Sequence, residues 1–266
     1  MTKTAEIFER VKKERPLVHH ITNWVSIYDC ANIVRAVGAL PVMAHAIEES
    51  ADMATISSSV VLNIGTLTNE VVEAMKVAGK AANSKNIPIV LDVVGAGATR
   101  YRNEKTIELI REVKIDIIKG NCSEIARVAG LDVFTKGVEA TKIDEDLTKI
   151  AQKLACEKQA TVVITGRQDI IADKNSVYIC RNGHEMMGKI VGTGCMSASL
   201  VGVFAAVEKD YGRAASAALV VFGIAGELAA GKSFGPGTFK NHLYDFLYNL
   251  SPSDIENLEK LEEVSC

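Results

Sequence analysis

The segment Lys189-Ile-Val-Gly-Thr-Gly-Cys-Met-Ser-Ala-Ser199 has the composition of a glycine turn that opens a helix. Gly192 and Gly194 allow positive φ angles and let backbone N–H groups come close to a ligand. The first N–H groups of a helix have no partner within it and lie at the positive end of its dipole. We therefore expect an anion hole that includes Thr193, with the thiol of Cys195 facing the anion. The pattern is short, and a tight turn packed against a sheet would use the same residues.

Strand-like and helix-like segments alternate along the whole chain around this turn. The strongest expected strand, residues 87–94, is apolar and β-branched, as a strand covered on both faces should be. Thr68 is placed to cap an expected helix over residues 68–83. Regular alternation predicts an α/β fold with a mostly parallel central sheet and helices on both faces. No linker or internal repeat divides the sequence, so we expect one domain over residues 1–266.

The second half of the chain leads to more local expectations. Residues 137–146 are polar and contain glycine, which predicts a mobile loop. Three short segments are expected to be antiparallel strands, at residues 170–171, 177–180 and 184–190. Residues 214–230 form the longest apolar run, and Gly223, Gly226 and Glu227 interrupt it. This run predicts a buried core helix rather than a membrane span.

Composition excludes several classes of function. The formal net charge is −3 and no basic block is present, so the sequence gives no electrostatic case for nucleic-acid binding. The six cysteines form no C-x-x-C pair, which is typical of reduced thiols in a cytoplasmic protein. The five histidines lack paired metal-ligand spacing, so no zinc site is expected. The N-terminus is charged and polar, unlike a signal peptide.

Polar and small residues follow six expected strands. In open α/β sheets, ligands bind at the carboxyl ends of the strands. Turn formation explains the glycines there, but it does not require Asp92, Asn121, Glu124 and Thr165 as well. The strand ends carry Thr22-Asn23, Asn63-Ile-Gly65, Asp92-Val-Val-Gly-Ala-Gly97, Lys119-Gly-Asn121, Thr165-Gly166 and Gly192-Thr-Gly194.

Each of these polar residues also has a purely structural interpretation. Asp92 fits a turn former or a magnesium-water ligand beside phosphates. Asn121 and Glu124 have the spacing of a capping box, but they also fit a nucleotide contact and a magnesium-water ligand. Lys119 fits a surface lysine or a partner of phosphate charge. Thr165 fits an ordinary strand exit or a phosphate contact.

Two patterns occur in contexts that argue against the function that they usually indicate. Residues 226–233 match G-x-x-x-x-G-K-S, but they lie in the last turns of an expected alanine-rich helix, where the N–H groups are already bonded. Gly95-x-Gly97 could begin a nicotinamide-binding fingerprint of an oxidoreductase, but Arg100 stands where a third small residue belongs. A protein that binds a nucleotide without catalysing a reaction is a further alternative.

The combination of motifs resembles the ribokinase-like kinases. More narrowly, the sequence is similar to the hydroxyethylthiazole kinase family of thiamine salvage over nearly its whole length. The motifs of the kinases are Asp92-x-x-Gly-Ala-Gly97, Asn121-x-x-Glu124, Thr165-Gly166, Gly192-x-Gly194-Cys195 and Gly235-Pro-Gly-Thr-Phe239. Those of the narrower family include Thr22-Asn23, Pro41-Val-Met-Ala44 and Leu62-Asn-Ile-Gly-Thr-Leu67.

This resemblance implies a kinase that transfers the γ-phosphoryl group of ATP to the hydroxyl of 4-methyl-5-(2-hydroxyethyl)thiazole. It also implies Mg²⁺ and a homotrimer with the thiazole pocket at a subunit interface. The implied thiazole contacts are Met43, Gly192 and Asn23. The implied ATP contacts are Lys119, Thr165 and Asn121, and the implied magnesium residues are Asp92 and Glu124. The implied catalytic group is Cys195 with the anion hole of Gly192, Thr193 and Gly194.

Two positions depart from the pattern of the narrower family. Lys119 stands where that family usually has Arg, and Val93 where it has Pro. Cys195, as is common in the narrower family, occupies the position of the Asp that accepts the hydroxyl proton in most ribokinase-like kinases. A thiol at a helix N-terminus can have a lowered pKa and act as a base, or it can only fill space. Other ribokinase-like enzymes (a hydroxymethylpyrimidine or pyridoxal kinase, or an ATP-dependent NAD(P)H-hydrate dehydratase) are alternatives, and they normally have Asp at this position.

Overall fold

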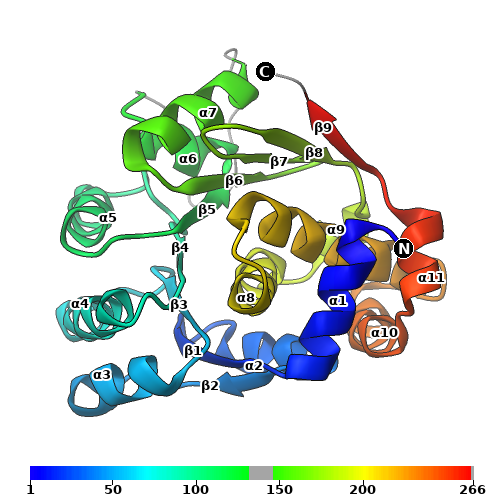
Figure 1. Ribbon diagram of the computed structural model, residues 1–266, viewed down its shortest axis with the longest axis horizontal. Helices are drawn as coiled ribbons and strands as arrows, with labels where there is room; N and C mark the ends of the chain where they lie inside the picture. The colour runs from blue at the N-terminus through cyan, green and yellow to red at the C-terminus, as the bar shows by residue number, and fades with distance from the viewer. Residues whose placement is uncertain (132–145, 265–266) are drawn as a thin grey trace.

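A nine-stranded sheet runs through the molecule in the order β2-β1-β3-β4-β5-β6-β7-β8-β9 (Figure 1). The computed structural model describes residues 1–131 and 146–264. Strands β2 to β6 are parallel to their neighbours, and β6 to β9 are antiparallel. The strands are β1 (Leu17–Ile21), β2 (Leu40–Val42), β3 (Ser59–Asn63), β4 (Ile89–Asp92), β5 (Ile117–Asn121), β6 (Thr161–Thr165), β7 (Asp169–Ala172), β8 (Val177–Cys180) and β9 (Leu261–Val264).

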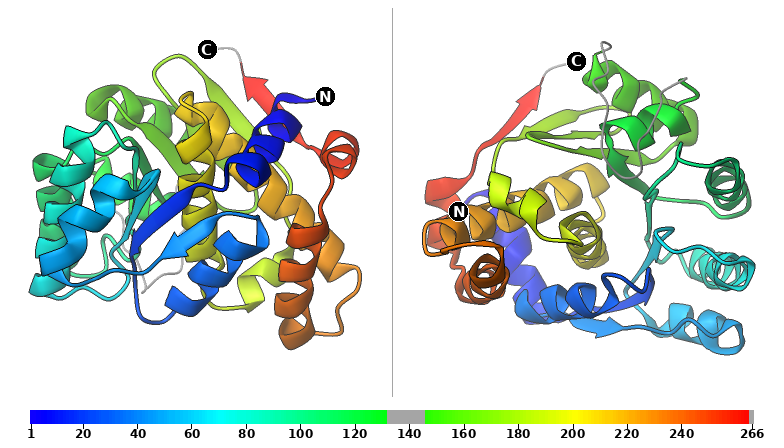
Figure 2. Two further views of the ribbon diagram at one scale, coloured as in Figure 1. Left: turned by 60° about the horizontal axis from the view of Figure 1, so that its bottom comes forward. Right: turned by 180° about the vertical axis from the view of Figure 1, so that it is seen from behind.

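Helices cover both faces of the sheet, which confirms the predicted α/β architecture (Figures 1 and 2). The helices on one side are α1 (Lys3–Glu14), α2 (Ile27–Ala36), α8 (Thr193–Val207), α9 (Tyr211–Ala230), α10 (Pro236–Asn249) and α11 (Pro252–Leu258). Those on the other side are α3 (Ile47–Ile56), α4 (Asn69–Ser84), α5 (Arg100–Glu112), α6 (Cys122–Val128) and α7 (Leu147–Lys158).

Alternate residues of the parallel strands supply two separate cores. In β3, Val61 packs with the helices α8 and α9, while Val60 and Leu62 pack with α4. All three side chains are buried, as expected where helices lie on both faces of a parallel strand. This arrangement explains why the central strands are continuously apolar in the sequence.

Helix α8 lies close against the middle of the sheet because it carries small residues there. A Cβ on Gly202 would lie 2.4 Å from Cγ2 of Val61, so a larger residue would push the helix away. Helix α9 packs beside α8 and is long and apolar enough to cross a membrane by composition. However, 78% of its apolar window is buried inside the protein, which confirms the expected core helix.

Local predictions agree with the structure in some places and fail in others. Thr68 caps α4 as predicted, since its side chain accepts a hydrogen bond from the N–H of Val71 at 3.2 Å. The expected strand over 184–190 is wrong, because Glu185–Lys189 is a 3₁₀ helix. Strand β8 already pairs with β9, which leaves no free edge for another strand beside it. The loop expected over 137–146 lies outside the described residues, except for the helix cap Asp146.

Strand β1 buries a histidine in its centre. His20 is fully buried, and its Nδ1 lies 3.1 Å from the carbonyl oxygen of Val18. The pKa of His20 is lowered to about 3, mainly by burial and also by the neighbouring His19 and His45, while the contact with Val18 opposes the shift. The folded protein therefore keeps this side chain neutral at pH values where an unfolded chain would protonate it.

This histidine should make stability depend on pH. The unfolded chain takes up a proton as the pH falls below about 6.5, whereas folded His20 does so only near pH 3, so the folded state loses stability across that interval. Between pH 7 and pH 5, we expect His20 to lower the unfolding free energy of the wild type by about 2 kcal/mol. His20→Leu should lack this contribution, so its unfolding free energy should fall by about 2 kcal/mol less. Urea denaturation at both pH values measures this difference. His184→Leu, at an exposed position, is the control, and equal losses in His20→Leu and wild type would contradict the prediction.

Candidate active site

The predicted glycine turn is the start of α8, at the edge of the sheet where the parallel strands end. Gly192 is the N-cap and has a φ of 93°, a conformation that favours glycine. A Cβ at this position would also lie only 2.9 Å from Cβ of Ser26. The helix begins at Thr193, so the N–H groups of its first turn remain free to bind an anion. The turn geometry is as predicted, while anion binding stays a prediction.

Five side chains from four strand ends and α8 form one hydrogen-bonded chain beside this turn. Nδ2 of Asn23 lies 3.2 Å from Sγ of Cys195 and 2.9 Å from Oδ1 of Asn63. Nδ2 of Asn63 donates to Oδ2 of Asp92 at 2.7 Å, and Oδ1 of Asp92 lies 3.3 Å from Nζ of Lys119. The structure therefore joins four predicted site residues through Asn63, which the sequence placed at a strand end without a role.

The register of the strands places most of these hydrogen-bonded side chains next to one another. Asn63 and Asp92 are directly opposite in β3 and β4, and Asp92 and Lys119 are directly opposite in β4 and β5. Side chains at opposite positions of adjacent strands lie within contact distance. One further pair, Asn121 and Thr165, is opposite in β5 and β6. The polar residues thus form a row across the carboxyl ends of four neighbouring strands.

Lys119 is not a surface lysine, because its side chain is only 2% exposed. Burial alone would lower the pKa of Lys119, but Asp92, Cys195 and Glu124 together outweigh this effect and the net pKa is raised. Burial raises the pKa of Asp92, and its contacts with Lys119 and Asn63 oppose that rise. A Cβ on Gly194 would lie 4.0 Å from Nζ of Lys119, so the ammonium is next to the free N–H groups of α8.

Asn121 and Glu124 form the capping box that their spacing predicted. Oδ1 of Asn121 accepts from the N–H of Glu124 at 2.9 Å, and Oε2 of Glu124 accepts from the N–H of Asn121 at 2.7 Å. Oε1 of Glu124 accepts from the N–H of Gly95 at 2.7 Å, which ties α6 to the loop after β4. Both carboxylate oxygens are therefore used by the backbone. Their roles towards nucleotide and magnesium stay predictions.

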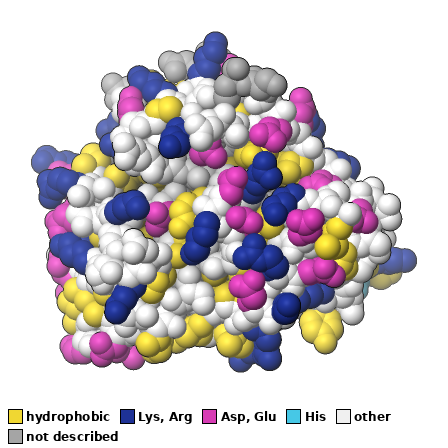
Figure 3. All heavy atoms as spheres, in the orientation of Figure 1, with side chains coloured by type: hydrophobic (Ala, Val, Ile, Leu, Met, Phe, Trp, Pro, Cys, Tyr) yellow, Lys and Arg dark blue, Asp and Glu magenta, His cyan; other side chains and the backbone are white. Residues whose placement is uncertain are grey.

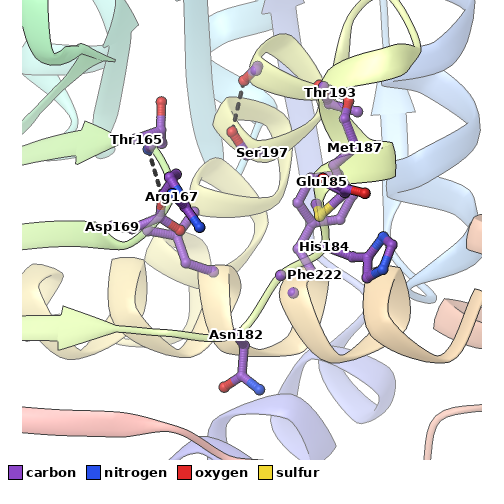
Figure 4. A pocket seen from close by; sticks show the side chains of 16 residues that line it. Thr165, Arg167, Asp169, Asn182, His184, Glu185, Met187, Thr193, Ser197 and Phe222 are labelled. Atoms are coloured by element: carbon purple, nitrogen blue, oxygen red, sulfur yellow. Dashed lines mark hydrogen bonds between the residues drawn. The ribbon is translucent and has the colours of Figure 1, made fainter. Parts of the chain in front are cut away.

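A cavity of about 530 Å³ opens between the end of β6 and the start of α8 (Figure 4). Thr165, Thr193 and Gly194 line one part of it, and the apolar Leu219 and Phe222 line another. The cavity therefore offers polar and helix-terminal groups together with an apolar wall, as a nucleotide with a charged and an aromatic part requires. Figure 4 shows Thr165 and Thr193 on separate elements around this space.

Asp169, also in the cavity wall, was not predicted. Its Oδ1 accepts a hydrogen bond from the N–H of Gly166 at 3.0 Å and so fixes the turn after β6. Burial raises the pKa of Asp169 to about 6. The sequence contains a weak signal for this contact, since Asp three residues after a strand-end glycine is a common turn former.

Arg102 is a second residue that was not predicted. Its Nη1 donates to the carbonyl oxygens of Ile64 at 2.6 Å and Val94 at 2.8 Å, and its Nη2 donates to that of Gly65 at 2.7 Å. The guanidinium group thus joins the loops after β3 and β4, which carry Asn63 and Asp92. An arginine near the start of an amphipathic helix has no sequence pattern that predicts such a contact.

Met43 takes no part in the hydrogen bonds described above and does not line the cavity. It is half-buried in the segment between β2 and α3. Nearby in this segment, Nε2 of His45 lies 3.0 Å from the backbone N of Thr22, the residue before Asn23. The structure therefore brings the segment of Met43 towards the end of β1, and a thiazole contact stays a prediction.

The G-x-x-x-x-G-K-S match is not a phosphate-binding loop. Gly226 lies inside α9, and the last residues of the match close the helix end. The N–H of Gly231 bonds to the carbonyl of Glu227 at 3.3 Å, and that of Lys232 bonds to Ala229 at 3.1 Å. These groups are not available to an anion, as the sequence context predicted.

Comparisons with known proteins place these features in a family. The model of the hydroxyethylthiazole kinase family matches residues 8–253. A hydroxyethylthiazole kinase of Methanosarcina acetivorans is 56% identical over 258 residues, which cover 97% of this chain and 99% of the relative. The structure of a hydroxyethylthiazole kinase protein from Pyrococcus horikoshii superposes with a TM-score of 0.91 at 39% identity and covers 100% of both chains. A ribokinase-like superfamily protein from Enterococcus faecalis shares the fold, with a TM-score of 0.63 at 13% identity over 95% of this chain and 98% of that one.

The Gly192 turn can be tested without a substrate. We expect Gly192→Ala to lower the unfolding free energy by about 1–3 kcal/mol, because it adds both a disfavoured φ angle and a clash with Ser26. It should also weaken binding of inorganic tripolyphosphate, measured by calorimetry, because the N–H groups of the first turn move. Gly231→Ala is the matched control, since its Cβ would make only ordinary contacts. Tripolyphosphate binding that is lost in Gly231→Ala and kept in Gly192→Ala would contradict this assignment.

Proposed function

Since the chain belongs to the hydroxyethylthiazole kinase family, we propose that it phosphorylates the hydroxyl of 4-methyl-5-(2-hydroxyethyl)thiazole with ATP. This reaction supplies the thiazole phosphate for thiamine biosynthesis or salvage. The observation that carries the proposal is the row from Asn63 to Lys119 next to the N–H groups at the start of α8, because the start of α8 also lines a cavity of about 530 Å³. We also propose that residues 1–266 act as one domain, because a single sheet includes strands from both halves of the chain.

The chemistry is the exchange of one P–O bond for another. The hydroxyl oxygen of the alcohol bonds to the γ-phosphorus, the bond to the bridging oxygen of ADP breaks, and ADP leaves with that electron pair. The transition state of such transfers is loose, so positioning and charge neutralisation provide most of the rate. We assign the N–H groups of Thr193, Gly194 and Cys195 and the ammonium of Lys119 to this neutralisation, and Thr165 and Asn121 to ATP binding.

The residues present fit a magnesium ion held largely through water. Mg²⁺ usually keeps several waters and takes one or two carboxylates together with substrate phosphates. Asp92 and Glu124 are such carboxylates, and each has oxygen lone pairs beyond the hydrogen bonds described above. When bound, the ion would neutralise charge on the phosphate oxygens. Within residues 1–131 and 146–264, no group of three or more His, Cys, Asp or Glu is placed to hold a metal, which agrees with a site completed by phosphate and water.

Cys195 is proposed to take the hydroxyl proton, as Asp does in most ribokinase-like kinases. The structure adds a constraint, because burial and the charge of Asp92 raise the pKa of Cys195, while Ser26, Lys119 and Asn23 lower it. Burial is the largest of these effects, and the net pKa of the thiol is raised, so the base role that we propose depends on the contacts that favour the thiolate.

The substrate is proposed to bind where Met43 and Gly192 of two subunits meet in a homotrimer. Support comes from apolar side chains next to Asn23 that are unusually exposed in a single chain. Trp24 is 56% exposed, Val25 67% and Tyr28 76%. Exposed aromatic and aliphatic groups of this kind mark contact surfaces.

Acidic and basic side chains are interspersed on the face shown in Figure 3, which offers no extended basic surface to nucleic acid. We place the reaction in the cytoplasm.

A direct assay decides the substrate. ADP release, coupled to pyruvate kinase and lactate dehydrogenase, should be fast with the thiazole alcohol and at least about tenfold slower with hydroxymethylpyrimidine or pyridoxal, because differences in pocket contacts are worth a few kcal/mol. NAD(P)H hydrate, assayed separately by dehydration, should not react. Equal or faster turnover of any of these competitors would overturn the proposed substrate.

Substitution of the thiol tests its role in proton transfer. We expect Cys195→Asp to keep or raise kcat, because a carboxylate is a competent base at this position. The same coupled assay measures kcat, and circular dichroism checks the fold. Cys156→Asp, at an exposed position of α7, is the control for adding a carboxylate elsewhere. A folded Cys195→Asp variant without any turnover would refute the base role.

A further inference from the structure

Asn23 lies at the end of β1 with every hydrogen-bonding atom of its amide engaged. Its Oδ1 lies 3.1 Å from the backbone N of Val25, and 3.0 Å and 3.1 Å from the backbone N and Oγ of Ser26. Backbone N–H groups can only donate, so the amide atom that faces them must be oxygen. The NH₂ group consequently faces the other way, towards Asn63 and Cys195.

The same reasoning fixes the amide of Asn63. Its Oδ1 accepts from the N–H of Gly65 at 2.9 Å and from Asn23, so its NH₂ group must face Oδ2 of Asp92. Asp92 can accept this bond as a carboxylate, and Lys119 holds its other oxygen. A flip of either amide would place donor against donor. Each amide therefore has a single orientation that satisfies its neighbours.

One consequence concerns the sulfur atom. The second N–H of Asn23 is directed at Sγ of Cys195 at 3.2 Å, so the sulfur acts as an acceptor. A donor that faces a titratable group stabilises its anionic form and opposes the burial of that group. Because Asn23 is 4% exposed and its other donor is used by Asn63, it has no free group for a ligand.

We propose that Asn23 is a positioning residue that holds Cys195 ready to accept a proton, and that Asn63 and Ser26 lock its amide in the required orientation. This role differs from the direct thiazole contact that the family resemblance implies for Asn23. Its effect on turnover rests on the phosphoryl transfer proposed above, whereas its effect on the sulfur does not. The inference can therefore be tested in the free protein.

The first experiment measures the reactivity of Cys195 in the absence of substrates. Iodoacetamide alkylates the thiolate, with formation of a C–S bond and loss of iodide, and the tryptic peptide 190–209 contains Cys195 as its single cysteine. Asn23→Asp places a carboxylate oxygen where the N–H was, so we expect alkylation at pH 8 to slow by about tenfold or more. Asn23→Leu removes the donor without adding charge and should slow it less.

Asn83 provides a matched control. Its amide also makes two hydrogen bonds, with the backbone N and O of Lys114 at 2.9 Å each, but it lies at the end of α4, away from the strand ends of the site. Asn83→Asp should leave alkylation of Cys195 unchanged. Alkylation of Cys195 at the wild-type rate in folded Asn23→Asp and Asn23→Leu would overturn the proposal.

Kinetics separate positioning from substrate contact. We expect Asn23→Leu to lower kcat by about tenfold, the smaller part of what general-base catalysis contributes, with KM for the thiazole alcohol changed by less than about threefold. In a Cys195→Ala background the same substitution should cause no further loss of kcat. A raised KM with unchanged alkylation, or additive losses, would overturn the proposal. If the wild type does not turn over the alcohol, the proposed function fails, and the alkylation result still decides the role of Asn23.

Discussion

The burial of the ion pair between Asp92 and Lys119 constrains every other polar group near it. Both side chains are only 2% exposed, so each loses most of its hydration. Such a pair is tolerable only when the geometry is good and the remaining hydrogen-bonding atoms are satisfied. The second oxygen of Asp92 therefore needs a donor, which Asn63 provides, and the oxygen of Asn63 in turn needs donors, which Asn23 and Gly65 provide. The orientation of the amide next to Cys195 follows from this sequence of requirements.

The sheet makes such a row possible at little cost in conformational entropy. Asn63, Asp92 and Lys119 are opposite one another in three adjacent strands, so the backbone already places them side by side. The loops beyond the strands need separate fixing, which Arg102 and Glu124 supply by hydrogen bonds to the backbone. Helix α8 can reach the same edge because Gly202 permits close contact with β3. Rigid strands thus hold the charged groups, and backbone contacts hold the loops.

The sequence was sufficient to predict the central strands and helices, but not to predict how the strands pair with one another. Apolar strands buried on both faces, the cap at Thr68 and the glycine turn at Gly192 all follow from local patterns, because their causes are local. Strand pairing decides that Asp92 faces Lys119 and that Asn63 joins Asn23 to Asp92. No local sequence pattern specifies this pairing. Strand β9 also had no signal, because its two central residues are exposed glutamates. The strand expected over residues 184–190 failed for a non-local reason as well, because β9 already occupies the edge of β8.

The polar row holds a buried cation next to the helix end at which we propose that a polyanion binds. Lys119 is neutralised by Asp92 in the free protein, so the site carries little net charge from this pair and does not need a counterion to fold. Further positive potential comes from the N–H groups at the start of α8, where no side chain caps the helix and no acidic residue stands in the first turn. A phosphate that approaches these groups also approaches Nζ of Lys119, which lies 4.0 Å from the position of a Cβ on Gly194. If a cation shares Asp92, the ammonium becomes free to interact with the phosphate, so occupation of the carboxylate and anion binding would reinforce each other through a single residue pair.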